Sequence, residues 1–257
     1  MNTIESHLPS LDSMKKYPEK LYYKGNLDLL SRRKVSIIGS RKPNQYAQQV
    51  THRLASELSR VGVCIVSGAA MGVDAIAHRG AGNNSTIAVL PCGIDLRYPA
   101  VNKSLLENIE TSGLTMSQFE PGFQATSWSF VVRNEIVVAL GDILIVTQAD
   151  IDSGSMRSVE FALEMGKKIY VLPHRIGESE GTNRLLADGK AEAIYDIDTF
   201  VGKFGMVNSE IDKSDPFMLF CATRPTYEEA VAKFGNRVFE AELIGLVNVN
   251  NGIINLE

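Results

Sequence analysis

The chain has 257 residues, of which 44% are hydrophobic and 22% charged, an ordinary composition for a globular protein with a large core. No apolar run approaches the ~20 residues of a membrane span, and the first residues lack the apolar stretch of a signal peptide, so we expect a cytoplasmic protein with no membrane partner. Cys64, Cys92, Cys221 and the histidines lack the pairing and spacing of disulfide frameworks and metal sites, so we expect no disulfide, metal or other cofactor.

Charge is unevenly distributed along the chain. The net charge of −4 by itself counts against a nucleic-acid-binding protein. Residues 206–257 hold four basic and eight acidic residues, which leaves residues 1–205 neutral, and residues 31–60 hold seven Lys or Arg against one acid, Glu57. This pattern predicts a basic region early in the chain and an acidic tail.

Six short apolar runs alternate with helical patterns over the first 200 residues. The runs are rich in Val and Ile, as strands buried on both faces of a parallel sheet are, and lie at 35–39, 63–67, 86–90, 114–119, 143–148 and 168–173. The helical patterns lie at about 44–60, 73–80, 100–112, 128–140, 155–166 and 182–188. This alternation predicts an α/β fold with an extended, Rossmann-like, doubly wound and mostly parallel sheet, whose ligands bind beyond the carboxyl ends of the strands.

The rest of the chain predicts a second, smaller domain. Residues 205–216 are polar and aperiodic and indicate a linker between a large domain at 1–204, with 1–33 as its lead-in, and a domain at 217–257. The small domain is expected to hold an apolar turn at 217–222, helices at 226–234 and 236–246, and a hairpin that turns at Asn250-Asn251-Gly252. Thr226 and Glu229 have the spacing of a capping box. The plan is that of a winged-helix-like domain.

The first strand ends in Gly39-Ser40-Arg41-Lys42. A glycine lets the backbone approach a ligand closely, the following helix start favours an anion, and Arg41 offers a bidentate phosphate donor. The G-x-G-x-x-G and Walker A patterns are absent, which argues against a dinucleotide and against NTP hydrolysis. A turn glycine followed by solvated basic residues is the alternative, and this motif alone leaves it open.

Two further strand ends carry small residues. Ser67, Gly68, Gly72 and Asp74 follow the second strand, and Ser153-Gly154-Ser155 follow the fifth. Such loops expose backbone amides that bind phosphate oxygens, and several of them on one rim suit a polymer better than a mononucleotide. Asp74 with His78 one turn later is either an acid–base pair or a helix cap with an orienting hydrogen bond, and we favour the second interpretation.

Aromatic residues precede Arg133-Asn134. They are Phe119, Phe123, Trp128 and Phe130. Aromatics beside phosphate sites stack on the bases of single strands, although most of these four are equally compatible with the core. We expect one of them, Phe130 or Trp128, to be exposed.

Taken together, these motifs resemble the DNA-processing protein A family of bacteria. The segments that carry the resemblance are GSRKP (39–43), SGAAMGVDAIAHRGA (67–81), STIAVLPCGIDLRYPAVN (85–102), FVVRN (130–134) and SGS (153–155), within about residues 17–200. The resemblance implies a single-stranded DNA-binding protein that is not an enzyme, protects incoming DNA in natural transformation, helps to load the RecA recombinase and commonly forms homodimers.

The resemblance also implies a DNA groove. It is built from Gly39, Ser40 and Arg41, from Ser67, Gly68, Gly72 and Asp74, and from Phe130, Arg133 and Asn134, with Phe130 stacked on a base and Arg41 on a phosphate. The motif loops add Lys42, Ser153, Gly154 and Ser155 as DNA-binding candidates. The chain departs from the family at Glu135, where many members have arginine, and at Pro91-Cys92-Gly93. We expect these changes to weaken or reshape the groove without changing the type of activity.

Two other functions compete with this one. The first is a LOG-like nucleoside monophosphate phosphoribohydrolase, for which Arg133 and Glu160 stand in loosely similar places, although the PGGxGTxxE loop of those enzymes is missing. The second is a protein-interaction scaffold with a vestigial groove. For the acidic tail we expect protein contacts or a role in dimer geometry, since Glu228, Glu229, Glu240 and Glu242 oppose binding to phosphates.

Overall fold

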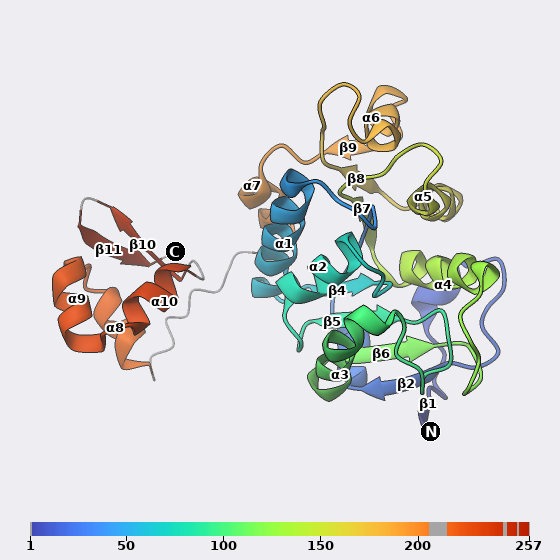
Figure 1. Ribbon diagram of the computed structural model, residues 1–257, viewed down its shortest axis with the longest axis horizontal. Coiled ribbons are helices and arrows are strands. Elements are labelled where there is room, and N and C mark those ends of the chain that lie inside the picture. The colour runs from blue at the N-terminus through green and yellow to red at the C-terminus, as the bar shows by residue number, and fades with distance from the viewer. Residues whose placement is uncertain (1, 206–214, 244–245, 251, 257) are drawn as a thin grey trace. The chain divides into compact units, whose positions relative to one another are not determined.

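The computed structural model describes residues 2–205, 215–243, 246–250 and 252–256, and Figure 1 shows it as a ribbon. The chain forms two compact units, Met1–Met206 and Val207–Glu257. Most of the predicted linker, 206–214, and residue Asn251 of the predicted hairpin turn lie outside the described residues. The two units are therefore described separately.

A nine-stranded sheet forms the centre of the first unit, in the order β1-β2-β6-β5-β4-β3-β7-β8-β9. The six predicted strands are present within two residues of their expected bounds, as β3 (Lys34–Ile38), β4 (Cys64–Ser67), β5 (Thr86–Val89), β6 (Leu114–Ser117), β7 (Ile143–Val146) and β8 (Ile169–Val171). These strands run parallel, and nearly all their residues are buried. The expected doubly wound, mostly parallel α/β sheet is confirmed.

Three strands at the edges were not expected. β9 (Glu192–Ala193) extends the parallel part, whereas β1 (Asn2–Thr3) and β2 (Tyr22–Gly25) add an antiparallel ribbon beside β6. Each is short and partly polar, so no apolar run marks it in the sequence. Pairing with a neighbouring strand, rather than local propensity, makes these residues extended.

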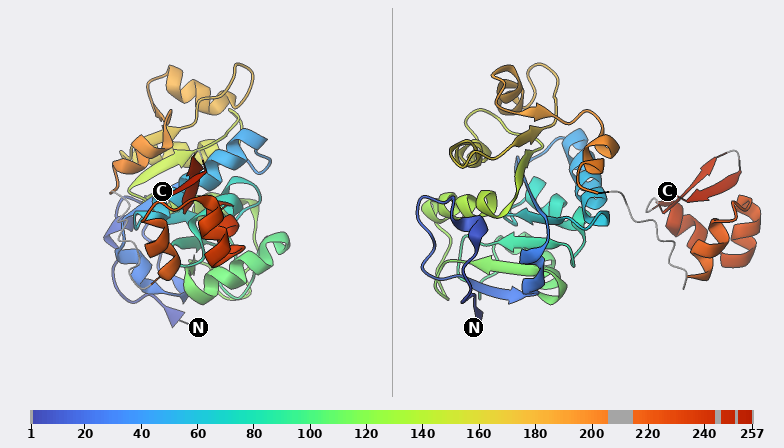
Figure 2. Two further views of the ribbon diagram at one scale, coloured as in Figure 1. Left: turned by 90° about the vertical axis from the view of Figure 1, so that its left-hand side faces the viewer. Right: turned by 180° about the vertical axis from the view of Figure 1, so that it is seen from behind.

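Helices cover both faces of the sheet, as Figures 1 and 2 show. One face packs against α1 (Gln45–Arg60), α2 (Val73–Ala81), α3 (Lys103–Ser112), which η3 (Ala100–Asn102) precedes, and α7 (Ile197–Gly202). The other packs against α4 (Ser127–Leu140), α5 (Gly154–Glu164), α6 (Glu180–Ala187) and the 3-10 turns η1 (Pro9–Leu11) and η2 (Leu27–Ser31). The six predicted helices are all present, and α7 is an additional one.

β3 is the strand at which the winding of the sheet reverses. It pairs with β4 on one side, through Val35 and Ile65, and with β7 on the other, through Val35 and Ile143. The connections that leave these neighbours run in opposite directions, which opens a crevice at the carboxyl ends of the strands. This is the place where a ligand is expected from topology alone.

The second unit contains three helices and a hairpin. They are α8 (Pro216–Cys221), α9 (Tyr227–Phe234), α10 (Arg237–Leu243), β10 (Val247–Asn250) and β11 (Ile253–Leu256), around a core that includes Phe217, Val238 and Ile254. The apolar turn expected at 217–222 is instead helical, because Asp215 caps the Phe217 amide and Pro216 occupies the first helical position. The predicted capping box is confirmed, since the Thr226 amide donates to Glu229 at 2.9 Å and the Glu229 amide to Thr226 at 3.2 Å.

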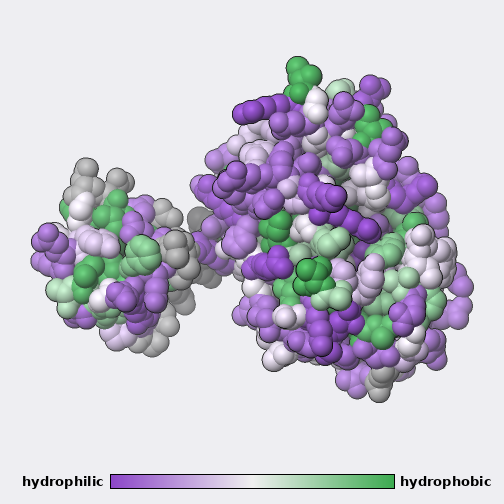
Figure 3. Space-filling view, in the orientation of Figure 1, coloured by the Kyte–Doolittle hydropathy of each residue, from purple (hydrophilic) through white to green (hydrophobic). Residues whose placement is uncertain are grey.

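The surface is mostly hydrophilic in the view of Figure 3, with separate apolar patches on the larger unit. Cys64, Cys92 and Cys221 are buried free thiols. None of the helices in the described ranges combines the length and the apolar character needed to cross a membrane.

Candidate functional site

A cavity of about 590 Å³ lies at the switch point of the sheet. Four segments meet there: the turn after β3, the loop before α2, the first half of α4 and the start of α5. Of the residues predicted for the site, those that line it are Gly39, Ser40, Arg41, Asp74, Phe130, Arg133, Asn134, Ser153, Gly154 and Ser155. The structure thus brings together residues that are up to about 115 positions apart in the sequence.

Four predicted residues do not line the cavity. Lys42 is exposed beside it, whereas Ser67 is buried and donates its hydroxyl to the Ile37 carbonyl at 2.7 Å, within the sheet. Gly68 borders a small neighbouring hollow, and Gly72 packs against the backbone of Ser40 and Arg41. Lining residues that the motifs missed include Ser127, Arg157 and Ser158, which lie on helices and carry no motif signal.

The turn after β3 is fixed from both sides. The Ser40 amide donates to the Gln148 carbonyl beyond β7 at 2.7 Å, and the Ser40 carbonyl accepts from the Val73 amide at the start of α2 at 3.1 Å. These two bonds connect the β7 side of the sheet with the β4 side. They hold Arg41 at the mouth of the crevice.

Gly72 is needed where two backbones cross. Its φ of +79° is unfavourable for other residues, and a Cβ there would lie 2.3 Å from the Ser40 carbonyl oxygen. Gly68 has a similar role, because a Cβ on it would lie 2.3 Å from the Arg133 guanidinium. The small residues of this loop therefore allow close packing around the cavity.

Arg133 is a buried cation within the cavity wall. Its Nη1 donates to the Gly68 carbonyl and, at 2.9 Å, to the Val89 carbonyl, and only 3% of the residue is exposed. Burial lowers the pKa of its guanidinium to about 10, an effect that Asp74 opposes and Arg41 reinforces. Arg133 remains protonated at neutral pH and contributes a fixed positive charge to the cavity.

Phe130 lies among two guanidinium groups and a second aromatic ring. The Cζ atoms of Arg41 and Arg133 lie 5.2 and 5.8 Å from its ring centroid, and Tyr98 meets it edge to face with centroids 5.8 Å apart. Arg41 is exposed and, within the part of the chain that the structure describes, forms no ion pair. The site therefore offers a partly exposed ring next to a cation without an ion-pair partner among the described residues.

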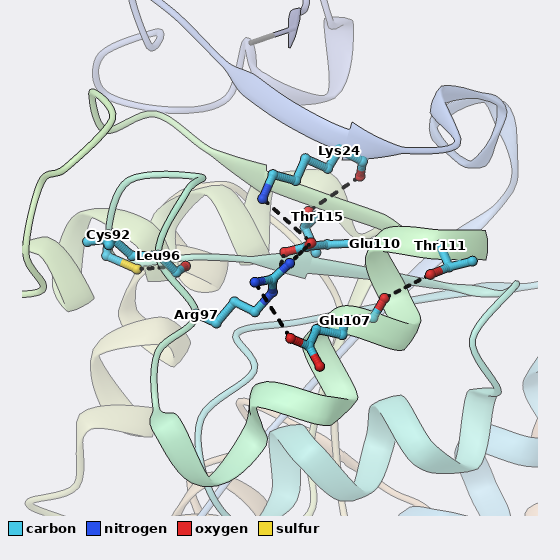
Figure 4. Close-up of polar contacts among 8 residues, drawn as sticks. All are labelled: Lys24, Cys92, Leu96, Arg97, Glu107, Glu110, Thr111 and Thr115. Atoms are coloured by element: carbon cyan, nitrogen blue, oxygen red, sulfur yellow. Dashed lines mark hydrogen bonds and ion pairs between the residues drawn. The ribbon is translucent and has the colours of Figure 1, made fainter.

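Tyr98 belongs to the loop after β5, and its neighbour Arg97 anchors this loop. Arg97 binds Glu110 of α3 with two hydrogen bonds of 3.2 and 2.7 Å, and Glu107 lies 3.6 Å from it (Figure 4). Lys24 of β2 reaches the same Glu110 carboxylate at 3.5 Å. This cluster of Lys24, Arg97, Glu107 and Glu110, the Arg97 network, fixes the loop that presents Tyr98.

The start of α5 faces the cavity. The Ser153 hydroxyl donates to the Asp150 carbonyl at 2.7 Å and makes no cap bond to the helix. The first amides of an uncapped helix carry a partial positive charge that favours an anion. Arg157, one turn further on, pairs with Glu160 at 2.5 Å.

Asp74 and His78 do not act as a pair. Asp74 accepts a hydrogen bond from the Ala70 amide at 3.3 Å, whereas His78 bonds Thr86 at 2.6 Å. Burial raises the pKa of the Asp74 carboxyl and lowers the pKa of His78 to about 3. His78 is therefore neutral at physiological pH. Neither part of the cap interpretation is seen: the N-cap of α2 is Gly72, without a side-chain cap bond, and Asp74 binds the loop before the helix rather than the helix amides or His78.

The basic residues of 31–60 do not form one patch. Arg41 and Lys42 lie at the cavity, but Arg33 donates to backbone carbonyls of 203–204, and Arg53 pairs with Asp198 at 3.0 Å. Lys34 is buried and donates to the Leu30 and Arg32 carbonyls. Several of these cations thus stabilise the fold, and the basic bias of the segment is weaker support for a binding surface than expected.

Two acidic residues singled out from the sequence lie outside the cavity lining. Glu135 accepts a hydrogen bond from the Lys15 amide at 2.8 Å. The glutamate at this position, where many family members have arginine, therefore contacts the N-terminal segment and not the cavity. Glu160 is exposed and paired with Arg157. Of the two residues named for the phosphoribohydrolase alternative, Arg133 lines the cavity and Glu160 does not.

Of the four aromatics, Trp128 is the most exposed, at 61%, and Phe130 is half-buried. Phe119 is buried and stacks on Phe123 at 4.7 Å. Trp128 does not line the cavity, and Phe130 does.

Comparison with known proteins gives matches over most of the first unit. A family model described as DNA recombination-mediator protein A matches residues 4–205. The DNA processing protein DprA of Streptococcus pneumoniae is 38% identical over 176 residues, which are 67% of this chain and 62% of that protein. That of Bacillus subtilis is 33% identical over 183 residues, 69% of this chain and 61% of that protein. The chain spans about half to three fifths of the length of the curated relatives that it matches.

Solved structures agree with these matches. DNA processing protein A from Helicobacter pylori, solved in a study of its single-stranded DNA binding mode, has a TM-score of 0.77 and 42% identity, and the match covers 79% of this chain and 94% of that one. The X-ray structure of DprA from Streptococcus pneumoniae has a TM-score of 0.72 and 34% identity, with coverage of 78% and 71%.

Proposed function

Because the chain belongs to the DNA recombination-mediator protein A family, we propose that it binds single-stranded DNA at the switch-point cavity and carries out no covalent chemistry there. The observation that carries this proposal is the partly exposed ring of Phe130 beside the guanidinium of Arg41, which forms no ion pair with the residues that the structure describes. A base stacks on the ring while the guanidinium binds the adjacent phosphate.

The shape and charge of the cavity support a single strand over a duplex. In a duplex the base faces are stacked on one another, so an aromatic ring in a cavity has nothing to contact. In a single strand each base presents a face, and stacking tolerates any sequence. Arg41, Arg133 and the start of α5 supply positive potential from three sides of the same cavity.

The wider role that we infer rests on kinship with the family. It comprises protection of incoming single strands in natural transformation, help in loading the RecA recombinase, and action as a homodimer. The acidic second unit is assigned to protein contacts in this scheme, because its helices expose Glu228, Glu229, Glu240 and Glu242.

Fluorescence anisotropy of a labelled single-stranded oligonucleotide, with a duplex of the same sequence as comparison, tests the binding proposal. We expect preference for the single strand and an affinity that falls as salt rises. Arg41→Ala should lose about 1–3 kcal/mol of binding free energy, the value of a charge-assisted hydrogen bond.

Arg53→Ala is the matched control. Arg53 is an exposed arginine of α1 that pairs with Asp198 away from the cavity, so its removal should leave the affinity unchanged. Equal losses in the two variants would mean that the chain attracts DNA only by general charge, and the cavity would not be the site.

A further inference from the structure

The rim that holds the cavity continues to a second pair of aromatic rings. Tyr46 is the second residue of α1, which follows β3, and His174 follows β8. Their rings meet edge to face with centroids 5.4 Å apart. Because β3, β7 and β8 are parallel, this pair lies on the same edge of the sheet as Arg41 and Phe130.

His174 is held firmly at this edge. Its Nε2 donates to the Thr147 carbonyl, just beyond β7, at 2.8 Å. Its backbone amide donates to the Asn183 side chain at 3.1 Å, and the Asn183 side chain donates back to its carbonyl at 3.2 Å. The imidazole therefore forms a rigid support for the ring that packs on it.

Tyr46 is not needed for the core. It is 44% exposed and belongs to none of the hydrophobic clusters among the described residues. An exposed aromatic ring on a rigid support has the properties of a base-stacking platform, since little conformational entropy is lost when a base binds to it.

The distance and the charges fit a strand that extends from the cavity. Tyr46 is five positions after Arg41, so their Cα atoms lie at most about 18 Å apart, within reach of a few nucleotides. Exposed Lys42 follows Arg41 directly in the sequence, whereas exposed Asp150 and Asp152 follow β7. Phosphates are attracted toward the start of α1 and repelled by the loop after β7.

We infer that Tyr46, supported by His174, stacks on a second base of the same single strand, a few nucleotides from the base on Phe130. The inference rests on the proposed function of the cavity. It assigns to the rim between β3 and β8 a sequence-independent contact that lengthens the binding site.

Oligothymidylates of increasing length, from about 4 to about 16 nucleotides, test the inference, since single-strand sites span this range. Their affinities are measured by anisotropy for the unchanged protein and for Tyr46→Ala, Tyr46→Phe, Arg41→Ala and Tyr195→Ala. Tyr195 is 84% exposed and follows β9, so it is a matched exposed tyrosine beyond the stretch of the rim between β3 and β8.

We expect Tyr46→Ala to weaken the longer oligonucleotides about fivefold or more, the low end for the loss of one stacked base, and to spare the shortest. Tyr46→Phe should restore the length dependence, and Tyr195→Ala should match the unchanged protein. If Arg41→Ala loses affinity while Tyr46→Ala binds every length like the unchanged protein, the inference that Tyr46 stacks on a base is wrong. The proposal that the cavity binds DNA is then still supported. If no oligonucleotide binds, the proposed function itself fails, and this inference with it.

Discussion

Two arginines predicted for one site have different surroundings. Arg41 is exposed, has its Cζ atom 5.2 Å from the Phe130 ring centroid and forms no ion pair within the described residues, so its donors are available to a ligand. Arg133 is 3% exposed and donates to the Gly68 and Val89 carbonyls. The sequence motif places both at the cavity but does not separate the binding residue from the supporting one, because burial is a tertiary property.

Arg133→Met should destabilise the fold rather than act on the ligand alone. The variant leaves the Gly68 and Val89 carbonyls without this donor, and an unsatisfied buried polar group costs about 1–3 kcal/mol. Urea denaturation checks this, with Arg41→Met as the control, which should change the free energy of unfolding by less than about 0.5 kcal/mol. Unchanged stability of Arg133→Met together with lost DNA binding would make Arg133 a direct contact instead.

At the scale of elements, the sequence predicts strands most reliably where a strand is buried on both faces of the sheet. The strands β3 to β8 appear as apolar runs for this reason, and the motif loops at their carboxyl ends indicate the rim of the site. β2 and β9 could not be predicted from the sequence, because pairing with a neighbouring strand, and not the pattern of their own residues, makes them strands. The contact of Tyr98 with Phe130 could not be predicted either, since only the folded sheet and the Arg97 network bring the loop after β5 to Phe130.

From the Arg97 network we expect Glu107 and Glu110 of α3 to contribute differently to the free energy of unfolding. Glu110 has a side chain that is 11% exposed and binds both Arg97 and Lys24, so Glu110→Gln should cost about 1.5–3 kcal/mol, as expected for hydrogen bonds to charged groups. Glu107 is 44% exposed and contacts only Arg97 in the described network, so Glu107→Gln should cost less than about 1 kcal/mol. Thermal and urea unfolding of the two variants measure the difference, and equal costs would show that burial of Glu110 has no bearing on its contribution.

At the scale of the whole molecule, the cavity and the acidic surface belong to different units. The cavity residues all belong to Met1–Met206, whereas the second unit exposes acidic side chains and also the apolar Phe239, at 60%. Such a surface favours contact with a protein over contact with a phosphate backbone.

A chain that ends at residue 205 should therefore keep its affinity for single-stranded DNA. Removal of eight acidic and four basic residues lessens repulsion, so the affinity at low salt should be equal to or somewhat higher than that of the full chain. Anisotropy titrations of both forms at several salt concentrations check this. A loss of about tenfold, or 1.4 kcal/mol, would assign DNA contacts to the second unit.

The edges of the sheet bear on how the chain associates with copies of itself. β1 and β9, the outermost strands, have two residues each, and so offer an incoming strand little more than a single pair of backbone hydrogen bonds. Long, flat edges invite intermolecular sheet extension, while very short ones discourage it. A homodimer that forms through the first unit would accordingly be built by side chains of helices and loops, and its geometry could change through surface substitutions without disturbing the sheet that positions the cavity.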